Sequence, residues 1–197
     1  MEKLTRLQKE ILFGILLGDA SLQWNENRTT CRLRYSQKNY AYIMHVYEIF
    51  KPFVKTPPSL CNKTEVWYFN TIQSPVFRFY RQQFYGKDEI KRIPRLIHRW
   101  LTPRTIAYWF MDDGSAKDRK TSSGVRFCTD CFTKDDVRLL AQKLSQVCNT
   151  QTSTYKQRDS LRIYVSGKKG NGKIFGEKLL PYIIPQMLYK VPPTWFN

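Results

Sequence analysis

The sequence has few acidic residues and no hydrophobic segment long enough to cross a membrane. Of its 197 residues, 16 are Asp or Glu against 33 Lys or Arg, which gives a formal charge of +17. The longest apolar run has eight residues, Ile11 to Gly18, whereas a bilayer requires about 20. That run ends at Asp19 without a small-residue cleavage signal, so we expect neither a membrane segment nor a targeting peptide.

Cysteine and histidine are also sparse, and their spacing argues against a zinc site. The five cysteines are odd in number and scattered, which is typical of a protein kept in a reducing, intracellular compartment. Cys128 and Cys131 form one C-x-x-C pair, but no second pair completes a zinc site. His45 and His98 lack the spacing of metal ligands. We therefore expect Cys128 and Cys131 to be structural or redox-inert.

The basic charge belongs to the whole chain. Residues 1–99 carry 17 basic and 8 acidic residues, net +9, and residues 100–197 carry 16 and 8, net +8. With 42% hydrophobic and 15% aromatic residues, the chain has enough apolar material for a folded core. Because a compact chain of this charge repels itself unless a polyanion neutralises it, nucleic acid is the expected class of partner.

The hydrophobic pattern predicts two similar halves joined by a basic connector, Gly86 to Arg99. In the first half it predicts a helix over 4–18, strands over 21–24 and 30–36, a helix over 40–50, strands over 59–61 and 66–72, and a helix over 75–85. In the second it predicts a helix over 103–113, a strand over 125–129, a helix over 135–147, strands over 152–156 and 161–166, and a helix over 174–180. We expect an α+β protein of two repeats, 1–99 with the connector and 100–197, whose sheets lie side by side.

Two segments of the same form occupy matching points of these repeats. Phe13-Gly-Ile-Leu-Leu-Gly-Asp19-Ala and Ala107-Tyr-Trp-Phe-Met-Asp-Asp113-Gly are apolar helices that end in an acid. Each alone is compatible with ordinary capping and turn chemistry. A carboxylate at a helix C-terminus is unfavourable by about 0.3–1 kcal/mol, so its occurrence in both repeats favours a role in holding a cation. Mg²⁺ prefers carboxylate, carbonyl and water oxygens, and a helix end offers free carbonyls.

These two segments resemble the signature motifs of the LAGLIDADG homing endonucleases. The likeness extends to Leu101-Thr-Pro and to Pro181-Tyr-Ile-Ile-Pro-Gln-Met-Leu-Tyr-Lys190-Val-Pro, and so covers nearly the whole chain. It is strongest to single-chain, two-motif members of yeast mitochondrial introns. The resemblance implies two pseudo-symmetric αββαββα halves, packed signature helices at the centre, and antiparallel sheets that form a saddle on double-stranded DNA. It also implies a monomer in an organelle that cuts both strands of a long asymmetric target and promotes intron mobility.

The resemblance assigns roles to particular residues. Asp19 and Asp113 would bind Mg²⁺, with Mn²⁺ or Ca²⁺ as substitutes for binding, assisted by the backbone carbonyls of Gly18 and Asp112. Lysines near each site in the family match Lys91 and Lys190, and supporting polar strand residues map loosely to Ser36, Gln37 and Thr129. The sequence departs from twofold symmetry because the second-half counterparts of Gly14 and Gly18 are Tyr108 and Asp112. We therefore expect asymmetric packing at the centre.

Alternation along the strands predicts the DNA-contacting side chains. Arg32, Arg34 and Ser36 share one face of their strand, opposite Leu33 and Tyr35. In the second half the same alternation places Lys156 and Arg158 on one face with Arg162 and Tyr164, opposite Leu161, Ile163 and Val165. The full predicted set is Arg32, Arg34, Ser36, Lys117, Arg119, Lys120, Arg126, Lys156, Arg158, Arg162 and Tyr164. Arg and Lys on a sheet face suit guanine edges and phosphates in the major groove, whereas in the alternative case the same residues form a solvated outer face.

Two further interpretations start from other features. Gly167-Lys-Lys-Gly-Asn-Gly172-Lys173 has the spacing of a phosphate-binding loop, but Ile174 replaces the Ser or Thr that would hold Mg²⁺, so we expect a basic loop on DNA.

The scaffold is also compatible with an RNA maturase that binds its group I intron RNA, or with a non-cleaving DNA-binding protein. Both signature acids are present, which favours the nuclease.

Overall fold

The computed structural model describes residues 3–119 and 121–196, and each half follows the predicted αββαββα order. The first half contains α1 (Arg6–Leu17), β1 (Ser21–Trp24), β2 (Cys31–Gln37), α2 (Tyr40–Phe50), β3 (Ser59–Cys61), β4 (Val66–Asn70) and α3 (Arg78–Phe84). The second contains α4 (Pro103–Asp113), β5 (Gly114–Ala116), β6 (Val125–Phe127), α5 (Lys134–Cys148), β7 (Thr152–Gln157), β8 (Ser160–Val165) and α6 (Asn171–Leu179). The α+β fold class is confirmed.

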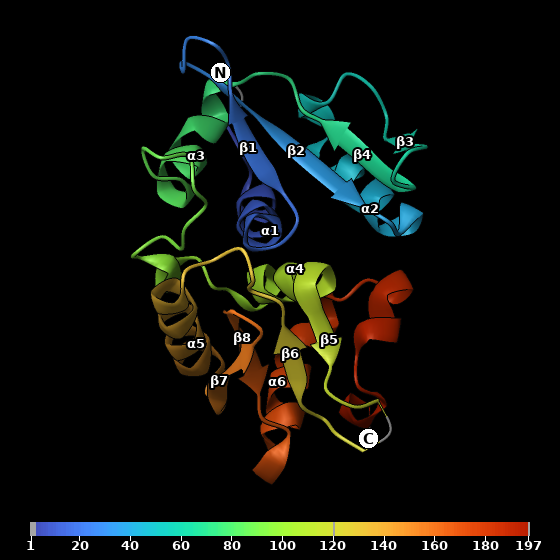
Figure 1. The fold of residues 1–197 in the computed structure, drawn as a ribbon. Helices are drawn as coiled ribbons and strands as arrows, with labels where there is room; N and C mark the ends of the chain where they lie inside the picture. Colours follow the sequence, from blue (N-terminus) through green and yellow to red (C-terminus); the bar gives the residue numbers. More distant parts are fainter. Residues whose placement is uncertain (1–2, 120, 197) are drawn as a thin grey trace.

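The two sheets have the same strand order and the same pairing direction. The first is ordered β1-β2-β4-β3 and the second β5-β6-β8-β7, and every strand pair that the described residues form is antiparallel. Figure 1 shows the halves facing each other, with α1 and α4 between the sheets. The antiparallel pairing excludes the parallel βαβ unit that a nucleotide-binding loop at 167–173 would need. No helix within the described ranges is long and apolar enough to span a membrane.

Capping residues set where the two central helices begin. Thr5 caps α1 and forms a capping box, because its hydroxyl accepts from the Gln8 N–H and the Gln8 side chain accepts from the Thr5 N–H. The Thr102 hydroxyl caps α4 by accepting from the Thr105 N–H, without a capping box, and Pro103 occupies the first helical position. Helix α1 ends at Leu17, with Gly18 as its cap before Asp19, and α4 ends at Asp113 itself, so both signature acids lie at helix C-termini.

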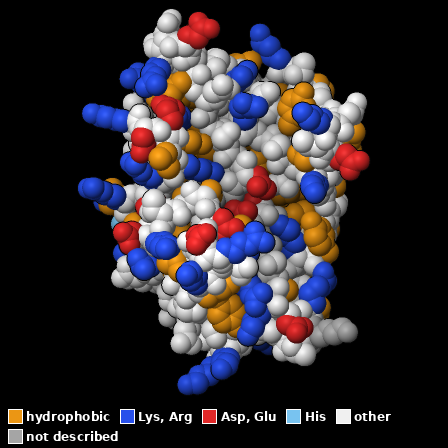
Figure 2. All heavy atoms as spheres, in the orientation of Figure 1, with side chains coloured by type: hydrophobic (Ala, Val, Ile, Leu, Met, Phe, Trp, Pro, Cys, Tyr) orange, Lys and Arg blue, Asp and Glu red, His pale blue; other side chains and the backbone are white. Residues whose placement is uncertain are grey.

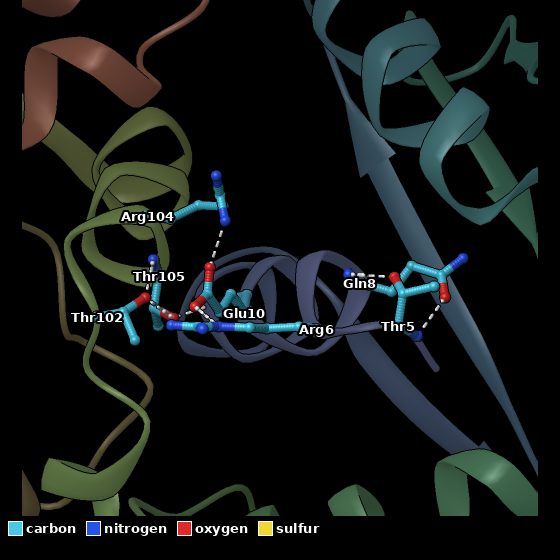
Figure 3. Close-up of polar contacts among 7 residues, drawn as sticks. All are labelled: Thr5, Arg6, Gln8, Glu10, Thr102, Arg104 and Thr105. Atoms are coloured by element: carbon cyan, nitrogen blue, oxygen red, sulfur yellow. Dashed lines mark hydrogen bonds and ion pairs between the residues drawn. The ribbon is translucent and has the colours of Figure 1, made fainter. Parts of the chain in front are cut away.

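The inner faces of α1 and α4 pack in close contact. A Cβ added to Gly14 would lie 2.5 Å from the Thr105 carbonyl oxygen and 2.8 Å from the Tyr108 Cβ. Polar contacts reinforce the packing, because the Thr105 hydroxyl donates to the Glu10 carbonyl at 3.0 Å and Arg104 pairs with the Glu10 carboxylate at 2.5 Å (Figure 3). The absence of a side chain at Gly14 is therefore what lets the helices approach.

Some predicted elements differ from the structure at their ends. Strand β5, Gly114–Ala116, was not expected, because small residues directly after a helix give no strand pattern, yet it pairs with β6 through the backbone. The strand predicted over 125–129 ends at Phe127. A 3₁₀ turn, Pro75–Phe77, precedes α3 where one helix was expected, and α6 begins at Asn171.

We predict that Gly14→Ala destabilises the protein by about 1–3 kcal/mol, because the added methyl group would force α1 away from α4. The gain in helix propensity, about 1 kcal/mol, opposes this loss but does not cancel it. Urea unfolding measures the difference. Lys9→Ala, on the exposed side of the same helix, is the matched control and should change stability by less than about 0.5 kcal/mol. Equal stability of Gly14→Ala and wild type would contradict close packing.

A second prediction concerns His45 on α2, whose Nε2 lies 2.6 Å from the Tyr108 hydroxyl of the other half. Burial lowers the pKa of His45 below its ordinary value of 6.5. His45 therefore binds a proton at higher pH in the unfolded chain than in the folded chain. His45 therefore makes stability fall as pH drops below about 6.5. Melting temperatures between pH 7.5 and 5 should decline more steeply for wild type than for His45→Gln; parallel curves would show that His45 does not contribute.

Candidate active site

The two signature acids meet where α1 and α4 end. Asp19, which follows the helix cap Gly18, is exposed, and Asp113, the last residue of α4, is partly buried. The Asp19 N–H donates to the Asp112 carboxylate at 3.1 Å, so the two motifs are in direct contact. Figure 2 shows acidic side chains near the middle of this face, between the halves, with Lys and Arg side chains around them.

Each motif is paired with one of the predicted lysines. Lys91 lies in the connector and donates to the carbonyls of Gly18, at 2.8 Å, and Ala20, at 3.0 Å. Lys190 follows α6 and donates to the carbonyls of Met111, at 2.5 Å, and Asp112, at 2.6 Å. Both ammonium groups thus sit at the negative end of a helix, where a cation is favoured. In both halves a lysine thus donates to the carbonyl directly before the signature acid, Gly18 or Asp112, whereas the second carbonyl that it contacts differs.

Strand β2 adds polar groups beside Asp19. The Gln37 side-chain amide donates to the Asp19 carboxylate at 2.7 Å and to the Asp112 carboxylate at 3.0 Å. The buried Tyr35, two residues earlier on the same strand face, donates its hydroxyl to Asp112 at 2.8 Å. Of the loosely mapped supporting residues, Gln37 therefore reaches the acids, whereas the Thr129 hydroxyl donates to the Leu161 carbonyl instead.

Burial and mutual repulsion shift the pKa values in this cluster. The pKa of Asp113 is raised to about 7, first by burial and then by the charge of Asp19, while Lys91 and Lys190 act in the opposite direction. Burial and the charge of Asp19 also raise the pKa of Asp112 well above its ordinary value. Burial lowers the pKa of both lysines. Three acids therefore share this place with two lysines, and an added cation would relieve the repulsion between the acids.

The donor set suits a hard divalent cation. It contains the Asp19 and Asp113 carboxylates and the carbonyl oxygens of Gly18 and Asp112, which are oxygen ligands of the kind Mg²⁺ prefers. Each of those carbonyls accepts from a lysine but has a second lone pair available. Within the part of the chain that the structure describes, no group of three or more His, Cys, Asp or Glu forms a metal site, so substrate or water oxygens would have to complete the coordination.

The first sheet presents the predicted basic face. Its register places Arg32 opposite Gln23, with the guanidinium donating to the Gln23 side-chain oxygen at 2.8 and 3.0 Å. Arg34 pairs with Ser21 and Asn70, and Ser36 pairs with Tyr68. All of these side chains share one face, and a hollow of about 150 Å³ beside Asp19 is lined by Ser21, Arg34, Tyr35, Ser36, Tyr68 and Asn70. The basic face of the first sheet therefore adjoins Asp19.

The second sheet corrects the face that was predicted for Lys156 and Arg158. Lys156 pairs with Leu161, so it lies on the opposite face from Arg162 and Tyr164. Arg158 lies in the turn between β7 and β8 with a φ of 54°, and it belongs to neither face. The prediction failed because the two-residue turn pairs Gln157 with Ser160, which shifts the alternation assumed for β7 by one residue.

The remaining predicted contacts lie on or near the second sheet. Arg126 pairs with Tyr164, and Arg162 is paired with Asp130. Lys117 lies 5.2 Å from the Tyr164 ring centroid, and the exposed Arg119 donates to the Tyr189 carbonyl. Lys120 lies outside the described residues. Sequence reasoning missed Tyr155, which pairs with Arg162 on the same face and whose ring centroid is 5.6 Å from the Arg126 guanidinium; knowledge of the turn length would have identified it.

Comparison with known proteins decides the family. A model of the LAGLIDADG DNA endonuclease family matches residues 9–172. The chain belongs to this family. DNA endonuclease I-ChuI of Chlamydomonas applanata is 30% identical, over 95% of this chain and 95% of that protein. A probable intron-encoded endonuclease of Wickerhamomyces canadensis is 32% identical, over 95% of this chain and 85% of its own length.

A solved structure supports the same relationship. The homing endonuclease I-WcaI, bound to its DNA recognition sequence, superposes with a TM-score of 0.89 at 29% identity, over 96% of this chain and 88% of that one. The resemblance found in the two signature motifs thus extends over the whole fold of this LAGLIDADG protein. The paired halves, the central helices and the two sheets are thus shared with the family, whereas the contacts at the helix ends were described above for this chain.

Proposed function

We propose that this LAGLIDADG protein is a site-specific endonuclease that hydrolyses one phosphodiester bond on each strand of double-stranded DNA. The observation that carries the proposal is that Asp19 and Asp113 lie together between two polar and basic sheet faces. Beside each acid, a lysine donates to a carbonyl at the end of the same helix. The DNA-bound relative I-WcaI supports the choice of substrate. Intron mobility is the role proposed for it, in line with the intron-encoded relative.

The proposed roles divide between acids and lysines. Asp19 and Asp113, with the Gly18 and Asp112 carbonyls, would hold Mg²⁺, which supplies an activated water and stabilises charge on the attacked phosphate when bound. Lys91 and Lys190 hold the motif backbones and place positive charge beside each acid, where it can stabilise the transition state. Because the two halves differ in sequence, each would read a different half of a long asymmetric target.

The chain length and the cysteines complete the proposal. One chain contributes both halves, 1–99 and 100–197, so we propose a monomer that needs no protein partner. All five cysteines are free thiols, which suits the reducing interior of a cell or organelle. An intron RNA maturase on the same scaffold would keep the basic surface but would not require both acids beside a lysine, and it is a distinct outcome of the tests below.

We predict that Asp19→Asn or Asp113→Asn lowers double-strand cleavage in Mg²⁺ below about a hundredth of the wild-type rate, because each removes a charged cation ligand. Binding to the target, measured without divalent cation, should remain within about threefold. The intron-free exon junction is the substrate, and chelation of Mg²⁺ should stop wild-type cleavage. Asp135→Asn, an equal charge change at an exposed residue of α5, is the control. Splicing of the intron RNA without DNA cleavage by wild type would overturn the proposal.

Binding should also depend steeply on salt. If the sheets and flanking loops make about 6–10 phosphate contacts, affinity falls about 10³–10⁵-fold between 50 and 200 mM salt. Arg34→Ala, on the exposed face beside Asp19, should reduce the slope of log affinity against log salt by about one if Arg34 contacts a phosphate. Equilibrium binding to labelled duplex measures both quantities, and a salt-insensitive complex would contradict a basic DNA-binding surface.

A further inference from the structure

The side chain of Asp112 lies at a junction that the proposed chemistry does not use. Only 8% of the residue is exposed, yet its carboxylate accepts three hydrogen bonds: from the Asp19 N–H at 3.1 Å, from the Tyr35 hydroxyl at 2.8 Å and from the Gln37 amide at 3.0 Å. All three donors belong to the first half of the molecule, whereas Asp112 belongs to the second. The carboxylate therefore ties the Asp19 backbone to the opposite half.

Gln37 connects the side chain of Asp19 to that of Asp112. Its amide nitrogen donates both to the Asp19 carboxylate, at 2.7 Å, and to the Asp112 carboxylate. Asp112 therefore holds the Asp19 backbone directly and its side chain through Gln37. Within the described part of the chain, the Asp113 carboxylate receives no comparable hydrogen bond, and its neighbours act on it through charge.

The second half cannot form the mirror image of this network. The registers Ser21–Arg34 and Ser115–Arg126 are equivalent, which gives four equivalent pairs: Gly18 with Asp112, Arg34 with Arg126, Tyr35 with Phe127, and Gln37 with Thr129. Gly18 has no side chain to accept a bond, Phe127 has no hydroxyl to donate one, and Thr129 bonds the Leu161 carbonyl. The network thus serves one of the two sites.

The contact between Gly18 and Asp112 has room for only one of the two side chains. A Cβ on Gly18 would lie 2.4 Å from both the Cβ and the Oδ2 of Asp112. Gly18 therefore makes room for the Asp112 carboxylate to reach the Asp19 N–H. An acid at both positions would produce a steric clash and would bury two like charges in contact.

We infer that Asp112 is a positioning residue for the Asp19 site alone, so that its side chain supports hydrolysis of the strand served by Asp19 and not of the strand served by Asp113. This inference rests on the proposed nuclease function. It assigns Asp112 a role through its side chain that is separate from the proposed use of its backbone carbonyl. The consequence is that the two strands respond unequally to changes in this network.

Asp112→Asn tests the inference with little change of volume. The carboxylate accepts on both oxygens, from Asp19 on one and from Tyr35 and Gln37 on the other. An amide offers one oxygen, so its NH₂ group must face an N–H or O–H donor on one side. Loss of such a charge-assisted bond is expected to slow the reaction at Asp19 about tenfold, with less than about threefold change at Asp113.

The measurement is the nicking rate of each strand under single-turnover conditions, with saturating protein, Mg²⁺ and a duplex labelled on both strands. Gln37→Leu, which removes the amide that contacts Asp19 directly, identifies the strand that Asp19 serves. Asp112→Asn and the milder Tyr35→Phe should slow that same strand and shift the ratio of the two rates. Tyr35→Phe retains the ring in the core and keeps the test valid if Asp112→Asn does not fold.

Gln8→Leu is the structural control. It removes a buried hydrogen bond to the Ile49 carbonyl at the other end of α1, so it lowers stability but should leave the strand ratio unchanged. If wild type cuts both strands and Asp112→Asn slows them equally, or slows the strand that Gln37→Leu spares, the inference is wrong and the nuclease function stands. If wild type cuts neither strand, the proposed function itself fails.

Discussion

Helix α1 approaches α4 so closely that neither Gly14 nor Gly18 has room for a Cβ without a shift of its neighbours. This contact brings two helix C-termini, one from each half, to the same point. Two carboxylates then lie at the negative ends of two helices in a partly buried place, which is unfavourable without compensation. Lys91 and Lys190 supply part of that compensation by donating to the carbonyls at the helix ends. The close packing therefore determines both the position of the acids and the demand for cations around them.

The charge of the molecule and the charge of the site have opposite signs. The chain carries +17 overall, which attracts a polyanion, but Asp19, Asp112 and Asp113 gather where the phosphates would be attacked. Carboxylates repel a phosphate unless a cation lies between them, and the pKa values of Asp112 and Asp113 are raised first by burial and then by the charge of Asp19. In the proposed nuclease, a divalent cation would satisfy the acids and the phosphate together, and one surface could then bind DNA and place acids against its backbone.

Sequence periodicity predicted the helices of both halves and most of the strands, because it rests on local pattern, and the pair of motifs at matching positions of two repeats singled out Asp19 and Asp113. The complete αββαββα order and the two lysines were predicted only through the family resemblance. The face of Lys156 could not be predicted, since it depends on the two-residue turn that pairs Gln157 with Ser160. Strand β5 was missed because its pairing comes from the backbone of Gly-Ser-Ala rather than from side-chain alternation. The Asp112 network joins residues 75 to 93 positions apart, a relation that only the packed helices create.

The centre of the molecule is asymmetric, with Gly18 in one half and Asp112 at the matching position of the other, and this is possible because both halves belong to one chain. In a symmetric pair of identical subunits, the positions of Gly18 and Asp112 would carry the same residue. Two glycines would leave the Asp19 N–H without its acceptor, and two aspartates would clash, given that a Cβ on Gly18 lies 2.4 Å from Asp112. A single chain with two different halves permits one glycine and one aspartate. The covalent connection thus allows a hydrogen-bond network that no identical pair could form, and it makes unequal chemistry at the two strands a consequence of the packing itself.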